Sequence, residues 1–309
     1  MKRIRINTAF LAAAILVLLG SCKKDFITLT PKGQFLTENY YQNRDQAFAG
    51  LVAVYDVLRK NAGGFENMIT MMNAGSDDNY AGGGGATDGA GIQGFSNYTI
   101  NPGIMPLSFW GDHYQGVFRA NVLLQKLPNT TMDAAEKARF TAEAKTLRAI
   151  YYFNLVRLFK NIPLILEPIG AADIYTVTQA TPAAVYAHIE KDLNDAITSL
   201  PSTVSGAQLG RLTKAAAQAM LGKVYLYDNK KTESAAMLAQ VNGTPGQTTQ
   251  YGNRLLPNFA DLWVFSNKFN SESILEACHT DKSNADWGWW GSSSDEGNTA
   301  SQMVGPRSY

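Results

Sequence analysis

The chain has 309 residues, of which 45% are hydrophobic and 17% are charged, so it can bury a substantial core. Its 27 lysine and arginine residues almost balance 26 aspartate and glutamate residues, which leaves a formal net charge of +1. A chain with this balance has no net field to attract nucleic acid or anionic lipid, and we therefore expect no nucleic-acid partner.

The first residues have the pattern of a bacterial export signal. Lys2, Arg3 and Arg5 are followed by an apolar run over residues 9–19, which is shorter than the about 20 residues that a membrane-spanning helix needs. The run ends in Leu-Gly-Ser-Cys, the sequence that precedes and includes the acylated cysteine of bacterial lipoproteins. We predict that residues 1–21 are a lipoprotein signal peptide and that Cys22 carries the lipid; the alternative is an ordinary signal peptide with a coincidental cysteine.

Apolar residues at helical spacing predict a first helix and a second helix. The first carries Phe48, Leu51, Tyr55 and Leu58 and ends at Gly63-Gly64. The stripe of the second consists of Trp110, Tyr114, Val117, Asn121 and Leu124. We expect Trp110 to lie in the core because it belongs to this stripe.

A long third helix is expected to start near Thr131 and to end at Ile162-Pro163. Asp133 and Glu136 have the spacing of a capping box at its start. Three consecutive aromatic residues at 151–153 cannot share one stripe, so this helix should be buried on more than one side. Arg148 and Arg157 would then lie among apolar residues and need carboxylate or carbonyl partners.

Later helices are marked by threonine caps. Residues 163–168 form a short extended segment, after which Thr181 caps a fourth helix with Pro182 in its first turn. Thr213 caps a fifth helix, and a sixth covers about residues 232–241. Only residues 228–231 separate the last two helices, which favours an antiparallel hairpin.

Leu221-Gly222-x-x-Tyr225 matches the start of a tetratricopeptide repeat, in which the glycine lets the paired helices approach closely and Leu238 lies near the later large apolar position.

Signals for catalysis or metal binding are weak. The only glycine-rich phosphate-type motif, Gly89-x-Gly91-x-x-Gly94, follows a glycine-rich loop, and we expect the residues after it to be extended, whereas a dinucleotide site needs a strand before it and a helix after it. The three histidines are scattered singly, so core or surface roles are expected. Cys278 lies in a predicted strand over residues 273–278 and is interpreted as a core residue. We predict no catalytic residue, no metal and no cofactor, although a pair of carboxylates that meet in space is not visible in a sequence.

Two loops have the composition of binding surfaces. The first contains Asp77, Asp78 and Tyr80 and continues into Gly82–Gly85; polar groups there can hydrogen-bond a ligand, and glycines allow close approach. A flexible linker, or a cation site that adds Asp88, remains an alternative for this loop.

The second loop, residues 286–291, has three tryptophans between glycines. On an extended segment Trp287 and Trp289 point to one side, as a stacking floor for a sugar, while Trp290 points to the other side as an anchor into the core. The alternative is that all three indoles pack in the core.

The order and spacing of several segments resemble the SusD/RagB family of surface lipoproteins, which capture nutrients for outer-membrane transporters. These segments are residues 22–31, Trp110-x-x-x-Tyr114, Arg119-Ala-Asn121, residues 142–163, Asp192-Leu193, Leu200-Pro201, residues 210–216 and residues 270–274. The resemblance implies a mainly α fold, with a tetratricopeptide-like helical scaffold over residues 22–245. Residues 246–309 would begin an irregular, loop-rich second region. Members of the family usually run longer, so this second region is expected to be incomplete.

The resemblance also implies a function. The protein would be a non-enzymatic lipoprotein of the outer membrane, facing the cell exterior, that binds oligosaccharides and delivers them to a SusC-like TonB-dependent transporter. Its ligand site would lie where loops of the two regions meet, which would bring Asp77, Asp78 and Tyr80 towards Trp287 and Trp289. Oligopeptide capture is the alternative within the family; a surface glycan hydrolase and a protein-binding helical-repeat adaptor are alternatives from other classes.

Replacement of the lipobox cysteine tests the predicted anchor. Cys22→Ala should release the protein from membranes or leave it as an uncleaved precursor, because no thiol remains to receive the lipid. Membrane fractionation and mass spectrometry of the mature protein are the measurements. An unmodified Cys22 in membrane-associated mature protein would contradict the assignment.

Overall fold

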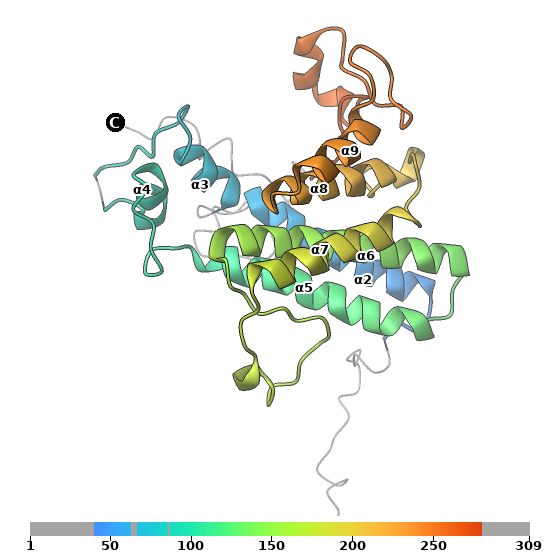
Figure 1. Cartoon of the computed structure of the whole chain (residues 1–309), viewed down its shortest axis with the longest axis horizontal. Coiled ribbons are helices and arrows are strands. Elements are labelled where there is room, and N and C mark those ends of the chain that lie inside the picture. The colour runs from blue at the N-terminus through green and yellow to red at the C-terminus, as the bar shows by residue number, and fades with distance from the viewer. Residues whose placement is uncertain (1–39, 63–66, 86, 280–309) are drawn as a thin grey trace, which may run out of the picture. The chain divides into compact units, whose positions relative to one another are not determined.

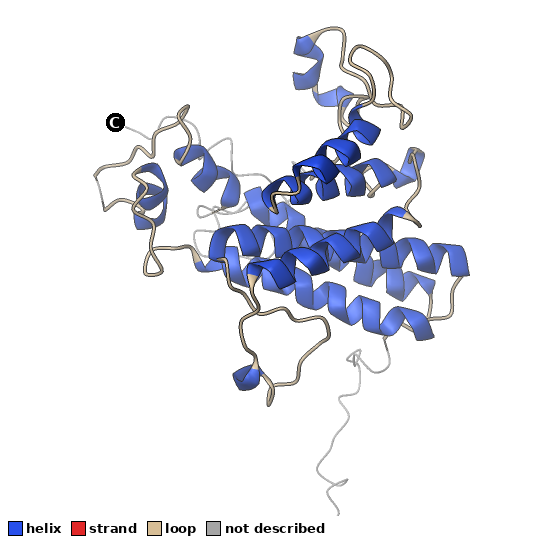
Figure 2. Ribbon diagram, in the orientation of Figure 1, coloured by secondary structure: helices blue, strands red, loops and turns tan. Residues whose placement is uncertain are grey.

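The computed structural model describes residues 40–62, 67–85 and 87–279. The chain divides into a unit that ends at Tyr40 and a unit that begins at Tyr41, and the description below concerns the second unit. Within the described ranges every regular element is a helix, which confirms the predicted mainly α fold (Figure 2). No helix in these ranges is long and apolar enough to cross a membrane.

The main helices pack successively on one another. Helix α5 (Leu107–Lys126) packs on α6 (Ala134–Phe159), α6 on α7 (Pro182–Ile197), α7 on α8 (Lys214–Tyr227), and α8 on α9 (Lys231–Asn242), while α2 (Arg44–Arg59) lies against α5 and α6 (Figure 1). The short helices α3 (Met68–Ala74) and α4 (Ala90–Ser96) pack on each other. This order of antiparallel neighbours is the helical scaffold that the sequence predicted.

The predicted helix starts are confirmed. The side chains of Asp133, Thr181 and Thr213 each accept a hydrogen bond from a backbone N–H in the first turn of α6, α7 and α8. Of the expected capping box, only the Asp133 hydrogen bond forms. The Glu136 carboxylate lies 2.7 Å from Arg44 Nη2 instead of accepting from the Asp133 backbone N–H. This ion pair joins the start of α6 to the start of α2.

Helix α6 is the central element of the core, and between residues 142 and 156 all of its residues except Lys145 are buried. Tyr151, Tyr152 and Phe153 are at most 1% exposed, which confirms the expectation from three consecutive aromatic residues. The burial has a direct cost, since polar groups on such a helix need partners inside the protein. Tyr151 donates to the Val54 carbonyl and Tyr152 to the Ile165 carbonyl, so each hydroxyl is satisfied.

The two predicted arginines of α6 have the partners they need. Arg148 binds both carboxylate oxygens of Asp192 at 2.8 and 2.9 Å, and donates to Asn121 Oδ1 at 2.7 Å. Burial alone would raise the pKa of Asp192, but the contacts with His188 and Arg148 outweigh it and hold this pKa below its usual 3.8. Arg157 donates to Asn154 and lies over the rings of Phe153 and Tyr227.

His113 and His188 make contacts within the protein that suit structural roles. His113 is buried, and its ring nitrogens lie 2.7 Å from the Phe109 carbonyl and 3.0 Å from Asn154 Nδ2. Burial lowers its pKa, so the ring is held neutral. His188 is not isolated on its helix, because Nε2 lies 3.3 Å from Asp192 Oδ2, four residues later. That carboxylate is already bound by Arg148, which makes it a poor metal ligand.

The first predicted helix forms as α2, which contains all four residues that predicted it. Its fully buried residues include Ala47, Leu51, Val54 and Val57. Phe48, Tyr55 and Leu58 are half-buried and line a cavity on this helix. The expected core position of Trp110 was wrong. Trp110 is 37% exposed and packs on Tyr114 and Phe159 at the surface; Phe109 takes the core position beside it.

The glycine-rich motif lies within a helix, not before an extended segment as expected. Helix α4 covers residues 90–96, and Gly89 precedes it with a left-handed φ of 73°. A Cβ at Gly94 would lie 2.6 Å from Ile104 Cδ1, so this glycine serves packing. Since the motif forms the helix itself, its N–H groups are not arranged as a phosphate-binding loop between a strand and a helix.

The α8–α9 hairpin is closely packed, as predicted. A Cβ at Gly222 would lie 2.6 Å from Leu238 Cγ, and Ser234 Oγ donates to the Gly222 carbonyl at 2.8 Å. Because Gly222 has no side chain, the Leu238 side chain of α9 can contact the backbone of α8 directly.

Irregular structure follows α9. Two 3₁₀ turns, Phe259–Trp263 and Phe265–Asn267, present large apolar side chains to solvent, and Trp263 is 78% exposed. The predicted strand over residues 273–278 does not form, and Cys278 is exposed instead of buried. The segment has no strand beside it in the described ranges, so its apolar residues line a surface cavity.

Two glycines of α5 provide a matched test of packing. A Cβ at Gly116 would lie 2.5 Å from the Tyr151 ring, whereas a Cβ at Gly111 would meet no atom within 4 Å. Gly116→Ala should lower the free energy of unfolding by about 1–3 kcal/mol through overpacking. Gly111→Ala should raise it by about 0.5–1 kcal/mol, because alanine favours a helix over glycine. Urea denaturation measures both, and equal effects would show that the Gly116–Tyr151 contact is not rigid.

Candidate ligand-binding site

The loop with Asp77, Asp78 and Tyr80 is fastened at its ends. It follows α3 on a small second core of Met71, Ala74, Ala81, Ile92 and Phe109. The Tyr98 hydroxyl donates to the Gly75 carbonyl at 2.7 Å, and Gln93 Nε2 donates to the Gly82 carbonyl at 2.7 Å. Gly82 and Gly83 have φ values of 64° and 89°, which explains why glycine occurs there.

The predicted polar residues of this loop face solvent. Asp77 and Asp78 are exposed, and the Tyr80 ring is 77% exposed. Asp88 accepts a hydrogen bond from the Gly84 backbone N–H at 2.8 Å, so it fastens the glycine run. Across the described ranges no group of three His, Cys, Asp or Glu residues is placed to hold a metal ion. Trp287 and Trp289, the other predicted ligand residues, lie outside the described ranges, as do Trp290 and Cys22.

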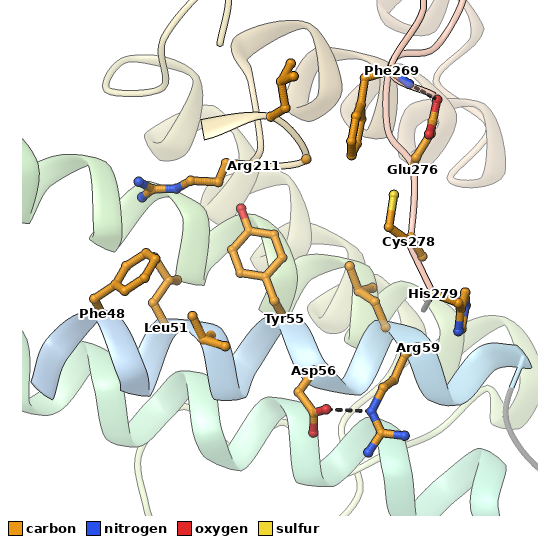
Figure 3. Close-up of a pocket in the computed structure, with 15 residues that line it drawn as sticks. Phe48, Leu51, Tyr55, Asp56, Arg59, Arg211, Phe269, Glu276, Cys278 and His279 are labelled. Carbon is orange, nitrogen blue, oxygen red and sulfur yellow. Dashed lines mark hydrogen bonds and ion pairs between the residues drawn. The ribbon is translucent and has the colours of Figure 1, made fainter. Parts of the chain in front are cut away.

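A cavity of about 490 Å³ lies against α2, and no sequence pattern described above predicted it. Its floor is the second apolar face of α2, with Phe48, Val52, Tyr55 and Leu58 (Figure 3). Its opposite wall consists of Leu209, Phe269 and the segment 276–279. The sequence does contain a signal for this cavity. Helix α2 is apolar on two sides, and a single apolar stripe describes only one of them.

A buried carboxylate binds two of the residues that line this cavity. Glu143 of α6 is fully buried; Arg211 Nη2 lies 2.7 Å from its Oε1, and Arg139 Nε lies 2.8 Å from the same oxygen. The Tyr55 hydroxyl donates to Glu143 Oε2 at 2.7 Å and accepts from the Leu212 backbone N–H at 2.9 Å. Burial, together with the Glu143 charge, raises the pKa of Tyr55 well above its usual value, so the phenol stays protonated.

Further charged groups of the cavity are paired. Asp56 Oδ1 lies 2.6 Å from Arg59 Nε, and Asp56 Oδ2 lies 2.8 Å from Arg119 Nη1. Burial opposes ionisation of Asp56, but the hydrogen bonds from these arginines prevail and its pKa falls below 3.8. The cavity therefore offers apolar and aromatic surface with Asp56, Arg59 and Arg211 paired, while Glu276 adds a carboxylate that accepts a backbone N–H.

Phe269 also lines a second cavity of about 210 Å³, which serine, threonine and asparagine residues line together with Tyr251 and Glu276. Phe269 has a positive φ of 55°, and its backbone N–H donates to Glu276 Oε1 at 3.2 Å. Its ring lies against Gly210, where a Cβ would approach the ring to 3.2 Å. Phe269 is therefore one of the residues that the two cavities share.

The titratable groups of these cavities are held by their neighbours. Burial and the nearby Glu276 raise the pKa of the Cys278 thiol, which keeps it in the less nucleophilic protonated form. The carboxylates of Asp56 and Glu276 are occupied by arginine and backbone N–H groups. The described fold is a helical-repeat scaffold with one cavity against α2 and a second beside Phe269.

Comparison with known proteins assigns the family. The SusD-like family described as starch-binding and associating with the outer membrane matches residues 67–226, which are more than half of the chain. The chain belongs to the SusD-like family, as its sequence motifs indicated.

Individual relatives agree with this assignment. SusD-like protein P25 of Formosa agariphila is 23% identical over 271 residues, which cover 82% of this chain and 48% of that protein. A SusD-like protein of Bacteroides ovatus is 25% identical over 287 residues, which cover 88% of this chain and 50% of that protein. The chain spans about half the length of these curated relatives.

Solved structures show the same fold. A laminarin-binding SusD-like protein is 60% identical with a TM-score of 0.83, and the match covers 87% of this chain and 58% of that one. Surface glycan-binding protein A from Bacteroides thetaiotaomicron, solved in complex with laminarihexaose, is 22% identical with a TM-score of 0.71. The match covers 83% of this chain and 53% of that one. At that lower identity the likeness concerns the fold alone.

Proposed function

We propose that this protein is a surface glycan-binding lipoprotein that captures laminarin-type oligosaccharides. The observation that carries the proposal is the 60% identity to a laminarin-binding SusD-like protein over 87% of this chain. The paired charges and the protonated thiol described above support a binding role without catalysis. Outer-membrane association in the family description supports an anchor at Cys22.

The ligand site we propose combines Trp287 and Trp289 with Asp77, Asp78 and Tyr80. The C–H face of a sugar packs on an aromatic ring, and each ring buried in this way contributes on the order of 1 kcal/mol or more. The exposed loop supplies the complementary chemistry, because Asp77 and Asp78 can accept hydrogen bonds from hydroxyl groups and the exposed Tyr80 ring can stack. The fastened ends of the loop reduce the ordering cost of binding.

Capture would serve transport. A ligand held beside a transporter experiences a raised effective concentration at its entrance, without any chemical change. We propose that a SusC-like TonB-dependent transporter receives the oligosaccharide. The helices from Thr181 to Val241 offer a continuous face of the kind that helical repeats use for protein partners.

Alanine substitution of the aromatic residues tests the ligand site. Trp287→Ala, Trp289→Ala and Tyr80→Ala should each weaken laminarihexaose binding at least tenfold, about 1.4 kcal/mol, while leaving the melting temperature nearly unchanged. Isothermal titration calorimetry measures the affinity. Tyr175→Ala is the matched control, because Tyr175 is 94% exposed on a separate loop and should have no effect.

The same titrations separate the alternatives. Wild-type protein that ignores laminarihexaose but binds members of an oligopeptide library would favour peptide capture. Release of shorter sugars on incubation would indicate a hydrolase. If the tryptophan variants unfold, or bind as tightly as wild type, these rings belong to the scaffold.

Charge reversal on the helical face tests transporter docking. Lys191, Lys223 and Glu233 are exposed on α7, α8 and α9. Lys191→Glu, Lys223→Glu and Glu233→Lys together should abolish co-purification with a SusC-like transporter from native membranes. Asp45→Lys on α2 is the control and should leave the complex intact. Undiminished co-purification of the triple variant would show that docking uses another surface.

A further inference from the structure

The cavity of about 210 Å³ beside Phe269 is more polar than the cavity on α2. It lies where the loop before α8 meets the segments around residues 251–253 and 269–276. Its volume is below the roughly 300–1,000 Å³ typical of sites for drug-sized ligands, so an occupant would have the size of a single ring. Most of its polar lining residues carry neutral hydroxyl or amide groups.

The walls of this cavity are joined by hydrogen bonds. Asn253 Nδ2 donates to the backbone carbonyls of Ser271 and Ser273 at 3.2 and 3.1 Å. The Tyr251 hydroxyl donates to Gln218 Oε1 of α8 at 2.5 Å, which attaches the same wall to the helical scaffold. Groups held in this way lose little freedom when a ligand binds, which lowers the cost of binding.

Several polar groups of the lining are open to a ligand. Within the described ranges, the hydroxyls of Ser202, Thr203 and Ser273 make no hydrogen bond. Asn253 Oδ1 and Glu276 Oε2 also lack one there, because the bonds of these two side chains use Nδ2 and Oε1. A hydroxyl both donates and accepts, whereas amide and carboxylate oxygens accept. The cavity can therefore exchange hydrogen bonds in both directions with a ligand that carries several hydroxyls.

The charges of the lining favour a neutral ligand. Arg211 is the one cationic residue among the described residues that line this cavity. Its guanidinium donates to both carboxylate oxygens of Glu143 and to Gln208 Oε1, so it is not available to a phosphate or a carboxylate. The Glu276 carboxylate would also repel an anion.

Phe269 adds an apolar surface to this polar lining. Its backbone N–H donates to Glu276 Oε1, which fixes the aromatic residue beside the carboxylate (Figure 3). Tyr251 is a second aromatic residue of the lining. A pyranose ring combines hydroxyls on its rim with C–H groups on its faces, and apolar faces pack on aromatic rings.

We propose that this cavity binds one neutral pyranose ring. Hydroxyls of the sugar bond the open groups of Ser273, Asn253 and Glu276, and its C–H face packs on Phe269. None of these residues belongs to the ligand site proposed above, so the cavity is a second sugar site. It does not depend on binding of laminarihexaose at the other site.

Titration with methyl glycosides tests the site in the full chain. Methyl β-D-glucopyranoside, methyl β-D-galactopyranoside and methyl α-D-mannopyranoside are the probes, and saturation-transfer difference NMR measures each Kd. Glu276→Gln should weaken the best-bound glycoside at least fivefold, because it replaces a charged acceptor by a neutral one. Ser273→Ala should weaken it about threefold, through loss of one neutral hydrogen bond.

Two matched variants control for indirect effects. Glu272 also accepts a backbone N–H, from Leu256 at 3.0 Å, but it does not line the cavity, so Glu272→Gln should leave the Kd unchanged. Ser266→Ala changes an exposed serine of the same irregular region and should likewise have no effect. Equal weakening in Glu276→Gln and Glu272→Gln would contradict the site.

Hydrogen exchange locates the sugar without any substitution, and it decides the matter if a variant fails to fold. The best-bound glycoside should slow amide exchange at least twofold in peptides that cover residues 249–254 and 269–276. Protection confined to residues 76–85 would place the sugar in the other site and overturn this proposal.

The remaining outcomes also decide for or against the cavity. Absence of saturable binding of all three glycosides would overturn the proposal. Binding of methylammonium, with none of the glycosides bound, would assign Glu276 to a cation instead. Failure of laminarihexaose binding alone would concern the proposed function, because the glycosides are titrated separately.

Discussion

The Glu143 carboxylate holds together parts of the chain that lie far apart in sequence. It is fully buried on α6, and it accepts from Arg139 on its own helix, from Tyr55 on α2 and from Arg211 in the loop before α8. Loss of one partner of such a group costs about 3–5 kcal/mol, since a charge is left without compensation away from water. Because Arg211 and Tyr55 also line the α2 cavity, the same contact fixes the cavity's floor against its wall.

One turn and a half further along, Arg148 makes a second network that faces other neighbours. Its contacts reach Asp192 on α7, Asn121 on α5 and the Leu166 carbonyl of the connection between α6 and α7. The first network has the Glu143 carboxylate at its centre, and the second has the Arg148 guanidinium. In each network the partners of the central charge come from different parts of the fold. The enclosed part of α6 thereby carries Glu143 and Arg148 without leaving either charge unpaired.

The sequence predicted α6 well because its signals are local. Asp133 marks its start, residues 151–153 require burial on several sides, and Arg148 requires partners, although their identity depends on packing. The exposed Cys278, the half-exposed Trp110 and the face of α2 towards the cavity could not be predicted. An apolar residue indicates a preference for burial, but the neighbour that covers it depends on how the whole chain packs. The wall opposite α2, for example, begins only at Leu209. Of the proposed ligand residues, Asp77, Asp78 and Tyr80 lie on an exposed loop as predicted, while their proposed proximity to Trp287 and Trp289 concerns residues outside the described ranges.

The close contact between Gly222 and Leu238 bears on how the protein opens. Helix α9 packs chiefly on α8, and α8 reaches the rest of the bundle mainly through α7. Because each helix of such a chain contacts mainly its neighbours, we expect the hairpin to separate while α5, α6 and α7 keep their amide protons protected. A partner bound along α8 and α9 would slow exchange of the hairpin with solvent without touching the core.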